Sequence, residues 1–178
     1  MSELESMTAA NGHRFSANAK NYASERDAII KFIDQIRANE NCSGQAFAKW
    51  AGTCETDSIR SGLAMIAERE SYHARVFERR LRDLGANPRA VEGDTVRGFH
   101  DYFGDQTLAD ATKLLRLTAL FPKPAETVRP FTNFTGAIKD DVQTKAMLKL
   151  CAQNELSSAT WLMESCAALN GVENAQSQ

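Results

Sequence analysis

The sequence predicts an all-α protein, an antiparallel four-helix bundle whose third helix is kinked or interrupted by prolines. Three observations support this prediction. All four prolines lie between residues 88 and 130, so long helices can form on both sides of that segment. Apolar residues recur at helical spacing in the flanking segments, and each long run is followed by a glycine. A chain of 178 residues, 43% of them apolar, is long enough for one such domain.

The first two helices are expected over residues 24–51 and 56–84. Gly52 follows the first periodic run and ends it. The second run ends in the segment Gly85–Pro88, where a left-handed glycine cap followed by a proline prevents continuation. Residues 1–23 are polar and are expected to form a leader ahead of the bundle.

The third helix is expected to begin at Thr107, after a loop rich in glycine, aspartate and aromatic residues. Thr107 and Asp110 have the spacing of a capping box, and Asp110 also suits a helix start as a negative charge. Pro122 and Pro124 interrupt this helix, and the segment to about Gly136 is expected to be its kinked continuation.

The fourth helix is expected over residues 140–169, where apolar periodicity resumes. Asn170 and Gly171 follow it as a stop signal. The bundle therefore spans residues 24–171, and residues 172–178 have the composition of a disordered tail.

Charge and cysteine content exclude several classes of protein. With 21 basic and 23 acidic residues and a pI near 5.9, the chain lacks the basic excess that nucleic-acid binding requires. The four cysteines form no Cys-x-x-Cys pair, which excludes zinc ribbons, thioredoxin-type motifs and rubredoxin-type electron-transfer modules. The chain shows no signal peptide and no apolar run near the roughly 20 residues that span a membrane. We therefore expect a cytoplasmic protein with reduced thiols.

Polar residues interrupt the core-facing stripes of three helices at the same depth. Such a stripe follows alternating steps of four and three residues. Glu40 lies in the middle of the first stripe, and Glu70 with His73 in the middle of the second. Glu155 and Ser158 occupy the same level of the fourth. The full stripes are Ile29, Ile33, Ile36, Glu40, Ser43, Phe47, Trp50; Ile59, Leu63, Ile66, Glu70, His73, Phe77, Leu81, Leu84; and Leu148, Cys151, Glu155, Ser158, Leu162, Cys166 or Ser165, Leu169.

A divalent metal ion is the simplest compensation for these carboxylates. Burial of one unpartnered carboxylate costs several kcal/mol, and three converging carboxylates also repel one another. Glu70 and His73 are three residues apart and point to the same side of a helix, so both can bind one ion. Glu40 and Glu155 would approach that ion from neighbouring helices. Carboxylate and imidazole ligands favour iron or manganese, and the expected lack of thiolate ligands disfavours structural zinc.

With these residues, the chain resembles the ferritin-like di-iron carboxylate proteins over residues 24–170. The segment Ala67–Leu84, AERESYHARVFERRLRDL, is similar to their second helix. The thirty residues from Glu40 to Glu70 resemble the spacing in demethoxyubiquinone hydroxylases and are slightly fewer than in rubrerythrins and bacterioferritins. That family has one Glu on each of two helices and Glu-x-x-His on each of the other two. The ligands that the resemblance implies are Glu40, Glu70, His73 and Glu155.

Two positions differ from the family pattern. Ser158 stands three residues after Glu155, where most of the family has histidine, so the second Glu-x-x-His is degenerate. The third helix offers Glu126, which lies 29 residues before Glu155, close to the 30 between Glu40 and Glu70. Because prolines surround Glu126, its helical phase is not defined, and its place as a fifth metal ligand is open.

Three functional classes follow. The first is a non-haem iron or manganese oxidoreductase that activates dioxygen or peroxide, takes a small-molecule oxidant or substrate and needs an external reductant. The second is iron oxidation and handling. The third is a ferritin-like bundle without metal that has a structural or binding role, with its carboxylates protonated or hydrogen-bonded and Ser158 as the mark of metal loss.

Two alternatives concern single features of the chain. His73 could be a hydrogen-bonded core histidine instead of a ligand. The aromatic residues of the third quarter could fill the core, which is the default, or line a substrate channel or a dimer face. We also expect a homodimer, because short bundles often self-associate. These aromatic residues are Phe99, Tyr102, Phe103, Phe121, Phe131 and Phe134.

Overall fold

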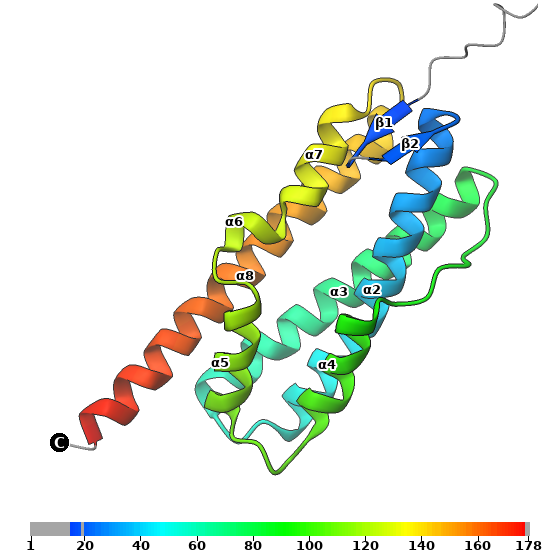
Figure 1. Cartoon of the computed structure of the whole chain (residues 1–178). Coiled ribbons are helices and arrows are strands. Elements are labelled where there is room, and N and C mark those ends of the chain that lie inside the picture. The colour runs from blue at the N-terminus through cyan, green and yellow to red at the C-terminus, as the bar shows by residue number, and fades with distance from the viewer. Residues whose placement is uncertain (1–14, 19, 177–178) are drawn as a thin grey trace, which may run out of the picture.

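The chain is mostly helical, with one small β-hairpin (Figure 1). The computed structural model describes residues 15–18 and 20–176. None of the helices in this part of the chain is long and apolar enough to cross a membrane. The elements are β1 (Phe15–Ala17), β2 (Lys20–Tyr22), α2 (Glu25–Thr53), α3 (Asp57–Asp83), α4 (Asp94–Gly104), α5 (Asp110–Leu120), α6 (Pro124–Thr127), α7 (Arg129–Ala137) and α8 (Val142–Gln176).

The antiparallel hairpin β1–β2 packs against α7 and the start of α2. Asn18 occupies its turn with a φ of 49°, a left-handed conformation that asparagine tolerates better than most residues. The Asn18 side-chain amide donates to the carbonyl of Pro130 at 3.1 Å. Phe15 packs edge-on against Phe134, with ring centroids 6.2 Å apart. The end of the predicted leader, residues 1–23, therefore packs on the helices, whereas its first 14 residues lie outside the described chain.

Helices α2 and α3 form a long antiparallel pair, and each begins and ends within two residues of its predicted range (Figure 1). Ser24 caps α2, because its Oγ accepts a hydrogen bond from the N–H of Asp27 at 3.1 Å. The predicted glycine stop of α3 is confirmed: Gly85 has a φ of 67°, and its N–H donates to the carbonyl of Arg82 at 2.9 Å.

Gly44 lets α2 and α3 approach closely, one turn after Glu40. A Cβ at this position would lie 2.6 Å from Oγ of Ser71 and 3.2 Å from the carbonyl oxygen of Ala67. Gly44 therefore serves close packing, which compensates for its low helix propensity.

Helix α4 forms where the sequence analysis expects a loop, so that expectation is wrong. Its glycines and aspartates, which suggest a loop, lie at its ends or on its exposed face. Phe103 is 1% exposed, and its ring stacks on Trp50 at 4.8 Å and on Phe99 at 5.4 Å. A short helix with one aromatic stripe can therefore pack along α2 although its sequence is rich in glycine and aspartate.

Three short helices, α5, α6 and α7, occupy the segment where one interrupted helix is expected, and all three pack along α8. The predicted capping box does not form, because Asp105 Oδ1 accepts from the N–H and hydroxyl of Thr107 at 2.8 and 2.7 Å. Helix α5 instead begins at Asp110. Pro124 and Pro130 each lie in the first turn of a new helix, where the missing N–H of proline costs nothing.

Helix α8 is longer than the sequence predicts. It continues through Asn170 and Gly171 to Gln176, because no proline follows and one glycine costs a helix only about 1 kcal/mol. Most of the predicted tail, residues 172–178, is therefore helical, and its last two residues lie outside the described chain.

The buried apolar residues form two clusters, separated along the helices by a polar level. One cluster contains Trp50 and Leu162, and the other contains Ile29 and Leu148. The buried polar side chains between the two clusters, each at most 5% exposed, are Glu40, Glu70, His73 and Ser158.

Asp110 connects the start of α5 to the turn between α2 and α3. Its Oδ1 accepts from the indole Nε1 of Trp50 at 2.8 Å, and its Oδ2 accepts from the backbone N–H groups of Glu55 and Thr56 at 3.0 Å. Burial opposes ionisation of Asp110, but these hydrogen bonds outweigh burial and lower its pKa. Burial and the hydrogen bond to Asp110 raise the pKa of the Cys54 thiol to about 11.

We expect Asp110→Ala to reduce the free energy of unfolding by about 3 kcal/mol near neutral pH, because four buried or half-buried donors, the Cys54 thiol among them, lose their acceptor. A lowered pKa stabilises the fold above the ordinary value of 3.8, and this contribution is lost as pH falls through the lowered value. The difference between parent and Asp110→Ala in urea unfolding should therefore shrink toward acidic pH. The exposed Asp101→Ala is the control, and an equal loss in that variant would contradict the assignment.

Candidate metal centre

Three helices bring five ligand-type side chains to the polar level between the apolar clusters. Helix α2 supplies Glu40. Helix α3 supplies Glu70 and His73, which are three residues apart and therefore lie on one side of the helix. Helix α8 supplies Glu155 and, four residues earlier on the same face, Cys151. Four of the five predicted ligands thus come together, and a thiol joins them.

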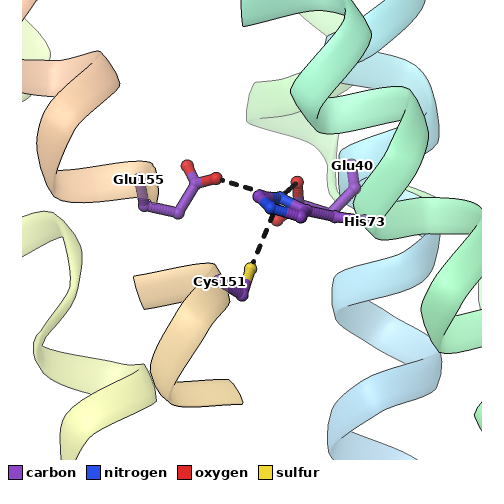
Figure 2. A group of neighbouring side chains, drawn as sticks. All are labelled: Glu40, His73, Cys151 and Glu155. Carbon is purple, nitrogen blue, oxygen red and sulfur yellow. Dashed lines mark hydrogen bonds and ion pairs between the residues drawn. The ribbon is translucent and has the colours of Figure 1, made fainter. Parts of the chain in front are cut away.

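The His73 imidazole lies at the centre of the group. Figure 2 shows three side chains that point at it: Glu40, Cys151 and Glu155. The Nδ1 atom of His73 is 3.1 Å from Oε2 of Glu40, 3.4 Å from Oε1 of Glu155 and 3.5 Å from Sγ of Cys151. One ligand atom from each of the four residues lies within 4.8 Å of the other three. The Glu155 side chain is 23% exposed, whereas the other three side chains are buried.

Asn154 orients the His73 ring from its other nitrogen. Nδ2 of Asn154 lies 3.1 Å from Nε2 of His73, so the amide donates to Nε2 while Nδ1–H donates to Glu40. A metal ion at Nδ1 requires the other tautomer, with the proton on Nε2. A flip of the Asn154 amide then presents Oδ1 as acceptor for that proton. Asn154 can therefore support either tautomer.

The carboxyl groups of Glu70 and Glu40 interact, and this interaction acts to lower the pKa of Glu40 and to raise that of Glu70. Burial raises the pKa of Glu40, and the charge of Glu155 raises it further. Burial likewise raises the pKa of Glu70, together with the charges of Glu40 and Glu155. Burial and the same three carboxylates raise the pKa of the Cys151 thiol well above its ordinary value. The group therefore concentrates negative charge where water does not stabilise it.

No permanent cation balances this charge. In the part of the chain that the structure describes, no lysine or arginine forms an ion pair with Glu40, Glu70 or Glu155. Arg69 donates instead to the Ser158 hydroxyl at 3.4 Å. Only protons or a bound cation can then neutralise the carboxylates.

The donor atoms fit a single transition-metal ion. Around a tetrahedral ion with bonds of about 2.0–2.3 Å, neighbouring ligand atoms lie about 3.3–3.8 Å apart. The three distances from Nδ1 of His73 run from 3.1 to 3.5 Å, close to that range. The upper limit of 4.8 Å in the group exceeds the range by about 1 Å, which side-chain rotation can close. Two carboxylates, one imidazole and one thiol therefore have both the chemistry and the spacing of a metal site.

A cavity of about 170 Å³ borders the group on one side. The polar lining residues are Ser43, Glu70, Thr118, Thr127, Glu155 and Ser158, and the remaining walls are apolar. Along α8, the lining residues follow Glu155 toward the C-terminus, whereas Cys151 precedes it, so the thiol lies away from the cavity. The apolar walls include Phe47, Ile66, Phe99, Leu117, Phe121 and Leu162.

Glu126 does not reach the group. It lies on α6, its side chain is 52% exposed, and it pairs with Lys123 at 3.8 Å and Arg129 at 3.4 Å. Helix α6 is a single turn that buries none of its residues. The near-equal spacing to Glu155 therefore does not indicate a second ligand-bearing helical pair.

Sequence reasoning misses Cys151 and Asn154. The stripe of α8 contains Cys151 one turn before Glu155, but a single cysteine among apolar residues has the pattern of core packing. The expected lack of a thiol among the candidate ligands is wrong, because three helices supply the group and no Cys-x-x-Cys pair is needed. Asn154 lies three residues after Cys151, and its role beside the imidazole can be recognised only when the position of the His73 ring is known.

Comparisons with protein-family models, with curated proteins and with solved structures found no match to this chain. The resemblance to ferritin-like proteins that the sequence suggests therefore stays a prediction. The chemistry of the group is the basis for any functional conclusion.

With metal chelated, we expect the protein to lose stability as pH rises. A raised pKa stabilises the fold fully below the ordinary value of 4.5 and loses that contribution as pH rises through the raised value. Glu70→Gln replaces the protonated carboxyl by an uncharged amide and should flatten this pH dependence in urea unfolding. Glu126→Gln, at an exposed position, should leave it unchanged. An identical slope in parent and Glu70→Gln would show that Glu70 does not titrate in this way.

Proposed function

We propose that this chain is a ferritin-like four-helix-bundle metalloprotein, a non-haem iron oxidoreductase with manganese as the alternative metal. In this proposal α2, α3 and α8 provide three helices of the bundle, and the interrupted segment α5–α7 takes the place of the fourth. The observation that supports it most is the convergence of Glu40, His73, Cys151 and Glu155 from three helices within 4.8 Å.

The chain's own residues have distinct parts in this proposal. Glu40, His73 and Glu155 would hold the ion, and Asn154 would orient the imidazole. When bound, iron would supply one-electron chemistry toward dioxygen or peroxide. Glu70 lines the cavity, and burial and the charges of Glu40 and Glu155 raise its pKa, so it would hold a proton that it can give to a molecule in the cavity.

The cavity supports a small and largely apolar substrate. Its walls are mainly aromatic and aliphatic, and two carboxyl groups, those of Glu70 and Glu155, lie among them. The chain has no Cys-x-x-Cys redox module, so electrons would come from an external reductant. The proposal places the protein in the cytoplasm, where such reductants are available and its cysteines stay reduced.

One observation favours a second candidate, a bundle that functions without metal. Among the described residues, every buried side-chain nitrogen and oxygen has a hydrogen-bond partner within the protein. The raised pKa values of Glu40 and Glu70 favour their neutral forms, and the His73–Glu40 hydrogen bond provides a partner within the group. In that case stability would depend on pH and would not respond to added metal.

Metal content separates the two candidates. Protein produced in medium supplemented with iron and manganese should contain close to one ion per chain. His73→Ala and Glu40→Ala should each reduce this content at least tenfold, because each removes one ligand of a small set. Glu126→Ala is the matched control and should keep the parental content. Parent protein without metal, with circular dichroism showing all variants folded, would exclude the metalloprotein and leave the second candidate.

Asn154 provides a test of ring orientation. Asn154→Leu removes the partner of Nε2 and should weaken metal binding about tenfold, whereas Asn154→Asp keeps an acceptor and should bind at least as tightly as the parent. Competitive titration against a chromophoric chelator measures both affinities. Equal weakening in the two variants would mean that Asn154 only packs against the ring.

A further inference from the structure

We infer that Cys151 is a ligand of this metal centre, so that the site combines thiolate, imidazole and carboxylate and selects Fe(II), Co(II) or Zn(II) over Mn(II). This inference rests on the proposed metal-binding function and assigns a fourth ligand to it. Thiolate is a soft ligand that favours these borderline ions, whereas manganese prefers oxygen ligands.

The placement of the sulfur supports this assignment. Sγ of Cys151 lies 3.5 Å from Nδ1 of His73, and it belongs to the set of ligand atoms within 4.8 Å of one another. Cys151 precedes Glu155 by four residues, so one face of α8 presents both ligands to the same point. Figure 2 shows the sulfur and the Glu155 carboxylate approaching the imidazole from two directions.

The other cysteines have different surroundings. Cys54 donates to Asp110 at 3.3 Å, and Cys42 donates to the carbonyl of Val96 at 3.6 Å. Cys166 accepts a hydrogen bond from Thr118 at 3.5 Å. Among the four cysteines, Cys151 alone belongs to the described group of potential metal ligands.

Metal binding at this sulfur conserves charge and electrons. The S–H bond breaks, its proton passes to solvent, and the sulfur lone pair forms the bond to the divalent ion without any change in oxidation state. The thiolate would lie on the side of the group away from the cavity, which Glu70 and Ser158 line.

Cobalt(II) is the probe for this inference, because a thiolate bound to cobalt gives an intense charge-transfer absorption in the near ultraviolet. The full-length parent loaded with cobalt should show this band, and Cys151→Ser should lose it while still binding cobalt through the other ligands. Cys166→Ser, a buried cysteine on the same helix, is the matched control and should keep the band. The preference for zinc over manganese should fall at least tenfold in Cys151→Ser.

The outcomes separate this inference from the proposed function. Cobalt bound to the parent without the charge-transfer band would overturn the role of Cys151 and leave the metal centre intact. Failure of the parent to bind any cobalt, iron or zinc would overturn both. X-ray absorption of the zinc-loaded parent needs no variant and should show one sulfur at about 2.3 Å. A first shell of nitrogen and oxygen alone would exclude the thiolate even if Cys151→Ser did not fold.

Discussion

The convergence of three carboxylates in one buried layer is the constraint on which the rest of the structure depends. Glu40, Glu70 and Glu155 lie between two apolar clusters, where like charges repel and water is largely excluded. Without an ion, protons must neutralise them, and the raised pKa values of Glu40 and Glu70 favour this protonation. When a cation is bound between them, the short separation of the three carboxylates becomes favourable, because each carboxylate is attracted to the cation. The layer is therefore suited to exchange protons for a cation, and His73 is the group that both arrangements share.

Such a layer requires that α2, α3 and α8 keep their relative positions, and polar contacts at both ends of the molecule hold them. At one end the Glu25 carboxylate accepts from the backbone N–H groups of residues 139–141 at 2.8 to 3.0 Å. Arg80 of α3 donates to Asp141 at 2.7 Å, just before α8. At the other end, Asp110 joins α5, which packs on α8, to the turn between α2 and α3. These charged contacts fix how far each helix is shifted along its axis relative to its neighbours. Apolar packing alone does not fix this shift.

Helical periodicity in the sequence predicted which residues lie at the same depth of the bundle. It did not predict contacts that depend on side chains from other helices. Alternating steps of three and four residues placed Glu40, Glu70, His73 and Glu155 at one depth, and the structure brings them together. The bounds of α2 and α3 were predicted to within two residues, although α2 continues through the predicted stop at Gly52 to Thr53. Glu126 could not be placed, because its orientation depends on how α6 turns after Pro124. Helix α4 was not predicted, because its glycines and aspartates are typical of a loop. The place of Cys151 was not predicted either, because it depends on the His73 ring, which another helix supplies.

The two sides of the polar layer differ, and this asymmetry links the site to a function. Cys151 and the more N-terminal part of α8 lie on the side of the apolar cluster that contains Ile29 and Leu148. The cavity lies on the other side, with Glu70 and Glu155 at its border. An ion held by His73 would thus be enclosed on one side and accessible on the other. An enclosed ion with no access would indicate a structural metal, whereas this arrangement provides a position for a small molecule next to a carboxyl group that can donate a proton. In the proposed function, this asymmetry is the feature that would let a small molecule approach the ion.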